Sequence, residues 1–126
     1  MIRGIVTPDL QAVIHLAVRG RAGCEEEIEF VIDSGFNTFL TLPSEIIVRL
    51  GLSKAGVSQA VLANGSEVEV AVYEAVVLWN NEERDVSVLE SDGALLGMAM
   101  LRGCEVKIEI VDGGAISIEA ITNRSL

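Results

Sequence analysis

Apolar and polar residues alternate along most of this chain, which is the pattern of β-strands that bury one face. The clearest run extends from Leu10 to Arg19, and a second run from Cys24 to Ile32 follows after a glycine-bounded turn over 20–23. Two alternating runs separated by such a turn predict a β-hairpin. The residues predicted to face the core are Leu10, Ala12, Ile14, Leu16, Val18, Ile28, Phe30 and Ile32.

Shorter alternating runs predict the other strands. In chain order they are an edge strand over 1–7, a hairpin over 61–70 that turns at Asn64-Gly65, a pair over 73–79 and 84–89, and a final pair over 105–111 and 115–121. Residues predicted to lie in the core of these strands are Val72, Val76, Leu78, Val86 and Val88, with Trp79 packing against them. The tail from Thr122 to Leu126 is predicted to be loose.

One segment has the features of a short helix instead of a strand. Pro43 suits a first helical turn, Glu45 lies near the positive helix start, Arg49 lies in the last turn, and Gly51 can end the helix. Its apolar residues Ile46, Ile47 and Leu50 are expected to pack on the sheet. A loop over 52–58 and one helical turn over 98–103 complete the predicted elements.

Composition agrees with a single all-β domain over residues 1–126. Half of the residues are apolar and only 4% are aromatic, and the predominance of Val and Ile favours sheet. Nineteen acidic against nine basic residues give a net charge of −10, which argues against nucleic acid and anionic membranes as partners. The sequence shows neither a secretion signal nor a long apolar run, so we expect a cytoplasmic protein that does not enter membranes.

No motif for a cofactor or a metal ion is found in the sequence. There is no nucleotide-binding loop, zinc signature or calcium loop, so we expect no cofactor and no metal. Cys24 and Cys104 are expected to be free thiols, and the only histidine, His15, is expected to be an ordinary strand residue. The acid run over 25–27 is expected to be a solvated hairpin edge that discourages strand-to-strand aggregation.

The stretch Phe30-Val31-Ile32-Asp33-Ser34-Gly35 carries the main candidate chemistry. A strand runs into a carboxylate, a hydroxyl and a glycine, which holds the Asp33 carboxylate at a fixed place. Asp, Ser and Gly are also common turn formers, so the motif alone is compatible with a plain structural turn. A second short apolar strand that ends in glycine follows sixty residues later at Leu95-Leu96-Gly97.

Together these two segments resemble the retropepsin-like (clan AA) aspartic proteases, which carry Asp-Thr/Ser-Gly after a strand and later a hydrophobic-hydrophobic-Gly element. Val31-Ile32-Asp33-Ser34-Gly35-Phe36 with Leu40-Thr41-Leu42-Pro43 looks most like the small bacterial and archaeal members. The resemblance covers about residues 10–100. It implies a closed β-barrel with one or two short helices, assembled as a homodimer.

The resemblance also implies roles for particular residues. Asp33, Ser34 and Gly35 would form the catalytic turn, in which the Ser34 hydroxyl bonds across to the second subunit and Gly35 allows close backbone approach. The hairpin tip, Ala63-Asn64-Gly65, would be the flap that closes over substrate. The other implied substrate-binding residues are Phe36, Asn37, Leu95, Leu96 and Gly97.

The implied activity is peptide-bond hydrolysis, and it requires a second carboxylate. One carboxyl group must act as base on a water while another donates a proton to the scissile carbonyl. This chain has one Asp-Ser-Gly, so the partner must be a second copy of Asp33 on a twofold axis. We therefore expect a homodimeric aspartic endopeptidase that acts on peptides or unfolded proteins, with a bell-shaped dependence of activity on pH.

The sequence departs from the retroviral pattern at two linked places. Phe36-Asn37 and Met98-Ala99 replace the residues whose Arg–Asp contact braces the retroviral dimer. The dimer must then use other surfaces, for which the terminal strands are the expected place because their valine and isoleucine faces need burial. Two alternatives remain open, namely a peptide- or protein-binding module with the same fold and little hydrolysis, and a structural β-domain.

Overall fold

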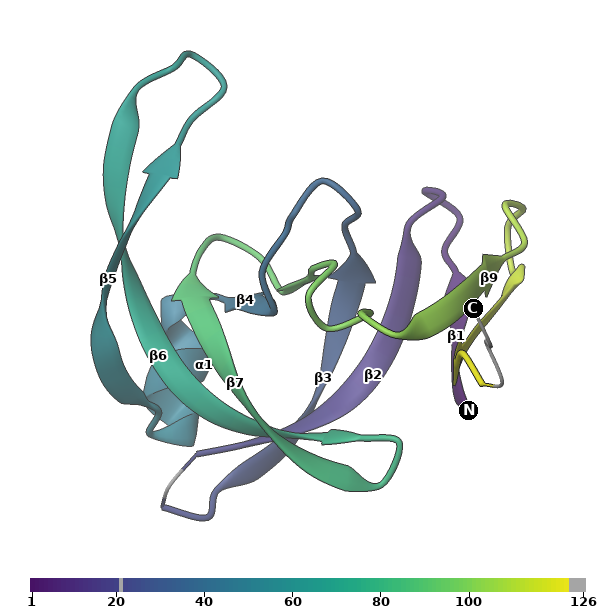
Figure 1. The fold of residues 1–126 in the computed structure, drawn as a ribbon, viewed down its shortest axis with the longest axis horizontal. Helices are drawn as coiled ribbons and strands as arrows, with labels where there is room; N and C mark the ends of the chain where they lie inside the picture. Colours follow the sequence, from purple (N-terminus) through teal and green to yellow (C-terminus); the bar gives the residue numbers. More distant parts are fainter. Residues whose placement is uncertain (21, 123–126) are drawn as a thin grey trace.

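The computed structural model describes residues 1–20 and 22–122, in which ten β-strands and one short helix are found (Figure 1). The strands are β1 (Ile2–Val6), β2 (Ala12–Arg19), β3 (Glu25–Ile32), β4 (Leu40–Leu42), β5 (Ser53–Val61), β6 (Glu67–Trp79), β7 (Glu82–Glu90), β8 (Leu95–Leu96), β9 (Cys104–Ile108) and β10 (Ala115–Ala120), and the helix is α1 (Ser44–Leu50). The prediction of a mostly β domain is confirmed. The predicted loose tail over 123–126 and Arg21 of the first turn lie outside the described residues.

All ten strands are linked into one sheet in the order β5-β6-β7-β4-β8-β3-β2-β1-β10-β9. Most neighbours are antiparallel, but β3 with β8 and β4 with β7 are parallel. A further pairing joins β6 to β2 through Val18–Val77 and Arg19–Val76. Strand pairing therefore runs from β2 through β3, β8, β4, β7 and β6 back to β2, while β1, β10 and β9 extend the sheet to one side (Figure 1).

The core lies on the inner face of this curved sheet. The predicted inward positions of β2 and β3 are confirmed for Ile14, Leu16, Val18, Ile28 and Phe30, all of which are buried. Burying such side chains contributes about 1.5–3 kcal/mol each, which is the main driving force for this fold. Leu10 is an error of the prediction, because it lies before β2 with φ 62° and its side chain is 60% exposed.

The face of β6 was also predicted wrongly. Ala75, Val77 and Trp79 are buried, whereas Val72, Val76 and Leu78 are only half-buried on the opposite face. Nearly every residue from 70 to 79 is apolar, so alternation could not decide which face is inward. The packing roles of Trp79, Val86 and Val88 are confirmed.

Two further predictions need correction. The strand at the N-terminus is not an edge strand, because β1 pairs with β10 on one side and with β2 on the other. The segment 52–58 is not a loop, because β5 begins at Ser53 and pairs along its length with β6, with an irregular register next to Gly56. Cross-strand pairing, which is a tertiary effect, decides the conformation of this weakly patterned segment.

The helix and the hairpins agree with the sequence. In α1, Ile47 and Leu50 are buried, and Gly51 ends the helix in the left-handed conformation with φ 64°. The connection between β6 and β7 narrows to Asn80-Asn81, both at positive φ, as a tight hairpin turn requires. Residues 98–103 form successive turns that are not continued as a helix.

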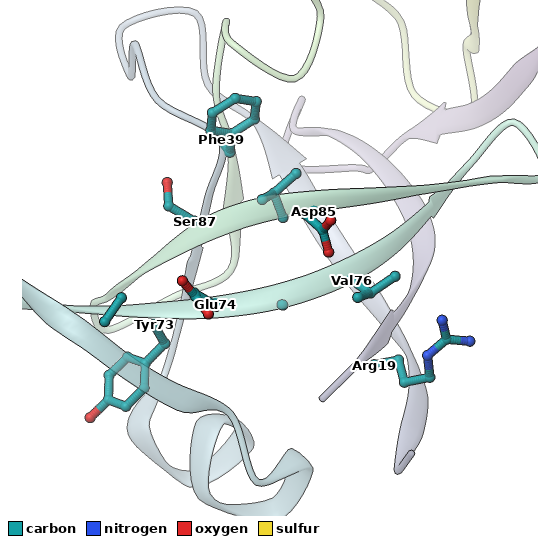
Figure 2. Close-up of a pocket in the computed structure, with 10 residues that line it drawn as sticks. Arg19, Phe39, Tyr73, Glu74, Val76, Asp85 and Ser87 are labelled. Atoms are coloured by element: carbon teal, nitrogen blue, oxygen red, sulfur yellow. The ribbon is translucent and has the colours of Figure 1, made fainter. Parts of the chain in front are cut away.

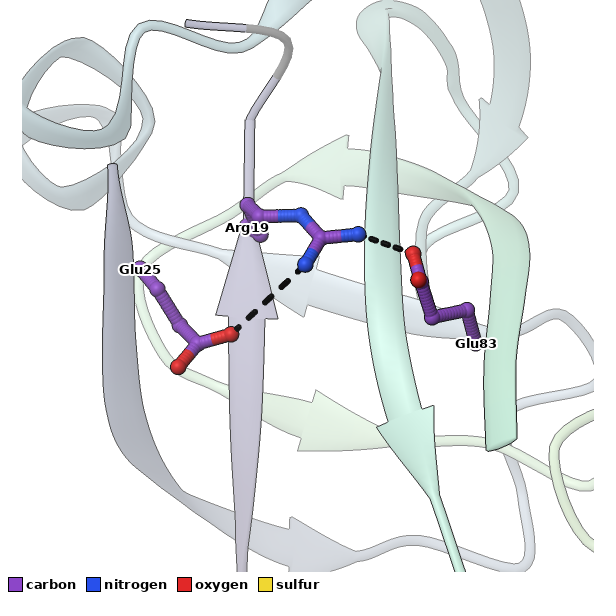
Figure 3. Close-up of polar contacts among 3 residues, drawn as sticks. All are labelled: Arg19, Glu25 and Glu83. Atoms are coloured by element: carbon purple, nitrogen blue, oxygen red, sulfur yellow. Dashed lines mark hydrogen bonds and ion pairs between the residues drawn. The ribbon is translucent and has the colours of Figure 1, made fainter. Parts of the chain in front are cut away.

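The hairpin of β2 and β3 is tied to its neighbours by charged side chains. Arg19, the last residue of β2, donates a hydrogen bond to Glu83 of β7 and lies 4.0 Å from Glu25 of β3 (Figure 3). This contact lies where β2 meets β6, so it ties together strands that are distant in the sequence. The predicted acid-rich edge of β3 is thus partly neutralised by Arg19 and by Arg49 of α1.

We expect Arg49→Met to move the titration of Glu26 toward higher pH. Both nitrogens Nε and Nη2 of Arg49 donate to the Glu26 carboxylate, at 2.8 and 2.6 Å, and this contact lowers the pKa of Glu26. The pair therefore adds stability above the ordinary glutamate pKa of 4.5, and the addition is lost as pH falls through the lowered value. NMR titration of the Glu26 carboxyl group in wild type, Arg49→Met and the control Arg102→Met measures this pKa. An unchanged Glu26 titration in Arg49→Met would contradict the prediction.

Candidate functional site

Asp33 lies directly after β3, in a turn held by backbone hydrogen bonds. Its N–H donates to the carbonyl of Leu96 at 2.9 Å, and its carbonyl accepts from Phe36 N–H at 3.1 Å. The Gly35 N–H donates to the Asp33 carboxylate oxygen Oδ1 at 2.9 Å. The carboxylate is thereby fixed in position while it remains partly accessible to solvent.

The turn over 33–39 crosses against the end of β8 at Gly97. The N–H groups of Gly97, Met98 and Ala99 donate to the carbonyls of Phe39, Phe36 and Thr38, at 2.8, 2.8 and 3.2 Å. A Cβ on Gly97 would lie 2.2 Å from the Thr38 carbonyl oxygen and 2.6 Å from Cδ2 of the Phe36 ring. Only glycine fits at this crossing, which brings together the two segments that the sequence singled out.

The other residues of the predicted catalytic turn have different surroundings. A Cβ on Gly35 would meet only Asp33 Oδ1, at 3.3 Å, so the close approach found within this chain is at Gly97 and not at Gly35. Ser34 and Asn37 are exposed, and their side chains form no hydrogen bond among the described residues. Phe36 is half-buried and lies against Gly97.

Thr41 is a positioning residue that sequence analysis did not identify. It is the one buried polar residue of the described chain, and it lies in β4 between two fully buried leucines. Its hydroxyl donates to the Gly93 carbonyl at 2.7 Å and accepts from Leu95 N–H at 2.9 Å. The Thr41 side chain therefore ties β4 to the start of β8. The available signal in the sequence was a hydroxyl residue between two leucines.

A row of apolar side chains leads to Asp33 on the sheet face opposite the main core. Ile5, Val13, Val31 and Leu95 are paired side by side across β1, β2, β3 and β8. None of them belongs to the main core cluster, which includes Leu96 on the other face of β8. Asp33 follows Val31 by two residues, and its N–H continues the pairing with β8 at Leu96. The row therefore forms an apolar floor beside the carboxylate.

The predicted flap is the outer half of the β5–β6 hairpin, which extends away from the sheet (Figure 1). Its turn is closed by Leu62 and Ser66, whose backbones bond at 2.8 Å, and Gly65 has φ 84°. Asn64 Oδ1 accepts hydrogen bonds from the N–H and the hydroxyl of Ser66, at 3.0 and 2.6 Å. The predicted tip residues Ala63, Asn64 and Gly65 are exposed, and no hydrogen bond in the described residues joins them to the Asp33 turn.

A pocket of about 520 Å³ lies elsewhere, against β6 and β7 (Figure 2). Its polar lining includes Arg19, Glu74, Asp85 and Ser87, and Phe39 lies at its side. None of the predicted site residues lines it. The pocket is therefore separate from the predicted catalytic residues, although Phe39 at the end of the turn over 33–39 lines it.

No protein-family model matches the chain, and a search of curated proteins finds no significant match. In the part of the chain that the structure describes, no three His, Cys, Asp or Glu side chains are grouped as they would be around a metal ion. The only helix there has seven residues, and none is long and apolar enough to cross a membrane. His15 and Cys24 are exposed, Cys104 is half-buried, and both cysteines are free.

Proposed function

We propose that this protein is a homodimeric aspartic endopeptidase in which Asp33 of each subunit supplies one of two catalytic carboxyl groups. The observation that carries the proposal is the crossing of the Asp33 turn and Gly97. There the lack of a Cβ on Gly97 allows close approach, and three backbone hydrogen bonds hold the turn beside β8. A simple surface turn would need no such support. The resemblance noted in the sequence rests on the same two segments.

In the proposed reaction the two Asp33 carboxyls share one proton. The ionised group takes a proton from a water molecule, which attacks the peptide carbonyl carbon, and the protonated group donates its proton to the carbonyl oxygen. Collapse of the tetrahedral species then breaks the C–N bond, and the amine leaves with a proton returned by the pair. The unpartnered Ser34 hydroxyl is free to bond across the twofold axis beneath the carboxylates.

The strand pairing supports the finer fold that this function requires. The circuit from β2 through β3, β8, β4, β7 and β6 returns to β2, as the proposed closed barrel would require. The β5–β6 hairpin leaves that circuit as a free ribbon with exposed apolar residues, Val57, Val61, Leu62 and Val68 among them. A bound peptide strand would cover such a ribbon, as expected for a flap.

The substrate class follows from the apolar floor. Val31 and Leu95 are half-buried in the paired strands next to the Asp33 turn. A peptide bound across Asp33 would place the side chains next to the scissile bond against them. We therefore expect extended peptides with apolar residues flanking the cleaved bond.

The test is incubation of the purified chain with an unbiased peptide mixture between about pH 3.5 and 7.5, with products identified by mass spectrometry. We expect cleavage between apolar residues, a bell-shaped pH profile because the pair must be singly protonated, and inhibition by a statine-type transition-state analogue. A dimer that binds peptides from the mixture without cleaving them would instead support the peptide-binding module. Absence of both cleavage and binding would contradict the proposal.

A further inference from the structure

The terminal strands, on which the dimer surface is expected, are covered only in part within this chain. β1 pairs with β10 within the subunit, and β10 pairs with β9. Val6, Ile116 and Ile118 are each about 1% exposed, so one face of these strands is covered, whereas Ile5 of β1 is 50% exposed. The need for burial that pointed to these strands is therefore only partly met within one subunit.

A different group of apolar side chains is left uncovered. Ile5, Leu10, Ile110 and Val111 are 50%, 60%, 65% and 60% exposed, and we call these four residues the turn patch. Ile5 lies in β1, Leu10 in the following turn, and Ile110 and Val111 in the turn between β9 and β10. Val6 joins these parts, because it bonds to Gly113 and Gly114 at 2.9 Å. The two turns are thus neighbours.

Both turns are held by backbone contacts, which suits a preformed binding surface. The Thr7 N–H donates to the Gln11 carbonyl, and the Leu10 N–H donates to the Thr7 carbonyl, each at 2.9 Å. In the second turn, a Cβ on Gly114 would lie 1.9 Å from the Glu109 carbonyl oxygen, so the backbone is tightly folded. Ordering of these turns therefore costs little when a partner binds.

Leu10 provides an independent observation. Its φ of 62° lies in the left-handed region, which is costly for leucine and is usually occupied by Gly, Asn or Asp. The residue is nevertheless an apolar one whose side chain is mostly exposed. The strained backbone and the exposed side chain of Leu10 are both unfavourable in the isolated chain. A contact between Leu10 and another chain would account for both.

The turn patch lies on the same side of the molecule as the Asp33 turn. In Figure 1 the β1–β2 turn, the β3–β4 loop, the β9–β10 turn and the tip of the β5–β6 hairpin all lie along the upper edge. Ile5 also begins the apolar row that passes through Val13 and Val31 to Leu95 beside Asp33. Ile5 therefore connects the patch, through the buried Val13, to the strands that lead into the Asp33 turn.

We propose that the turn patch is the central contact between two copies of this chain, and that this contact brings the two Asp33 turns together. This inference rests on the proposed function, because a site with one carboxylate is incomplete without a second copy. In a twofold interface each patch meets the same surface of its partner, so four apolar residues per chain form its core. Acidic residues Asp9, Glu109 and Asp112 border the patch and would form the solvated rim.

The test uses sedimentation velocity over a concentration series with three variants. Ile110→Glu/Val111→Glu places charges in the proposed contact and should raise the dimer Kd by at least about 100-fold. Leu10→Asn suits the left-handed backbone, so it should raise Kd by about tenfold without lowering the Tm of the monomer. Val48→Glu is the matched control, since Val48 is 79% exposed on α1, and it should leave Kd unchanged.

The outcomes separate this inference from the proposed function. If the wild type is a dimer and the double variant is equally dimeric, the patch is not the interface, although the protease proposal stands. If the variants dissociate but the wild-type dimer cleaves no peptide, the interface is supported and the protease proposal fails. A wild type that is monomeric throughout the concentration series would overturn both the interface proposal and the protease proposal. This outcome includes the case in which a basic partner protein, and not a second copy, covers the patch.

Discussion

Replacing Asp33 with asparagine is expected to lower kcat/KM for peptide hydrolysis by at least about 1,000-fold. In the proposed homodimer one substitution removes both carboxyl groups, so neither a base for the water nor an acid for the carbonyl oxygen remains. Asparagine retains an oxygen that can accept the Gly35 N–H, which now bonds to Asp33 Oδ1 at 2.9 Å. The turn should therefore keep its conformation, and the loss should appear in kcat rather than in folding.

Asp92→Asn is the matched control for this substitution. Asp92 is exposed in the bend before β8, and the same change of charge there should leave peptide hydrolysis unchanged. In the proposed dimer the Asp33→Asn change puts two neutral amides in place of the acidic pair and adds no charge repulsion, so this variant should dimerise at least as tightly as wild type. Equal rates of cleavage by Asp33→Asn and wild type would show that hydrolysis does not pass through Asp33.

The elements of the site were predictable because their signals are local. The strand that ends at Ile32, the helix that ends at Gly51 and the turn at Asn64-Gly65 each depend on a few neighbouring residues, and the structure has all three. Leu95-Leu96-Gly97 was recognised by the same kind of pattern. Local pattern therefore located the segments that carry Asp33 and the hairpin tip.

The predictions that were wrong or missing concern features that depend on contacts between distant parts of the chain. The face of β6 could not be read from nearly continuous apolar residues, and β5 is a strand because β6 pairs with it. The hydroxyl of Thr41 acquires its role only because Gly93 and Leu95, more than fifty residues away, fold against it. The two turns of the turn patch likewise become neighbours only in the folded sheet.

Gly97→Ala is expected to destabilise the protein by about 3 kcal/mol, since overpacking forces the hydrogen-bonded backbone to shift. The added methyl group would lie 2.2 Å from the Thr38 carbonyl oxygen, which also accepts the Ala99 N–H. To make room, the turn over 33–39 must move away from β8 and strain three hydrogen bonds. For a domain of this size, Tm should fall by about 10 °C.

The same displacement should reduce catalysis in the molecules that remain folded. A shift of about 1 Å in a catalytic group can cost about 100-fold in rate, so kcat should fall even at temperatures well below the new Tm. Gly93→Ala is the control, because a Cβ there would meet no heavy atom within 4 Å, and both Tm and kcat should stay near the wild-type values. Thermal unfolding and peptide hydrolysis of the two variants measure both effects. If Gly97→Ala lowered Tm but left kcat intact, the crossing would support the fold alone, and the placement of Asp33 would have to depend on the second subunit.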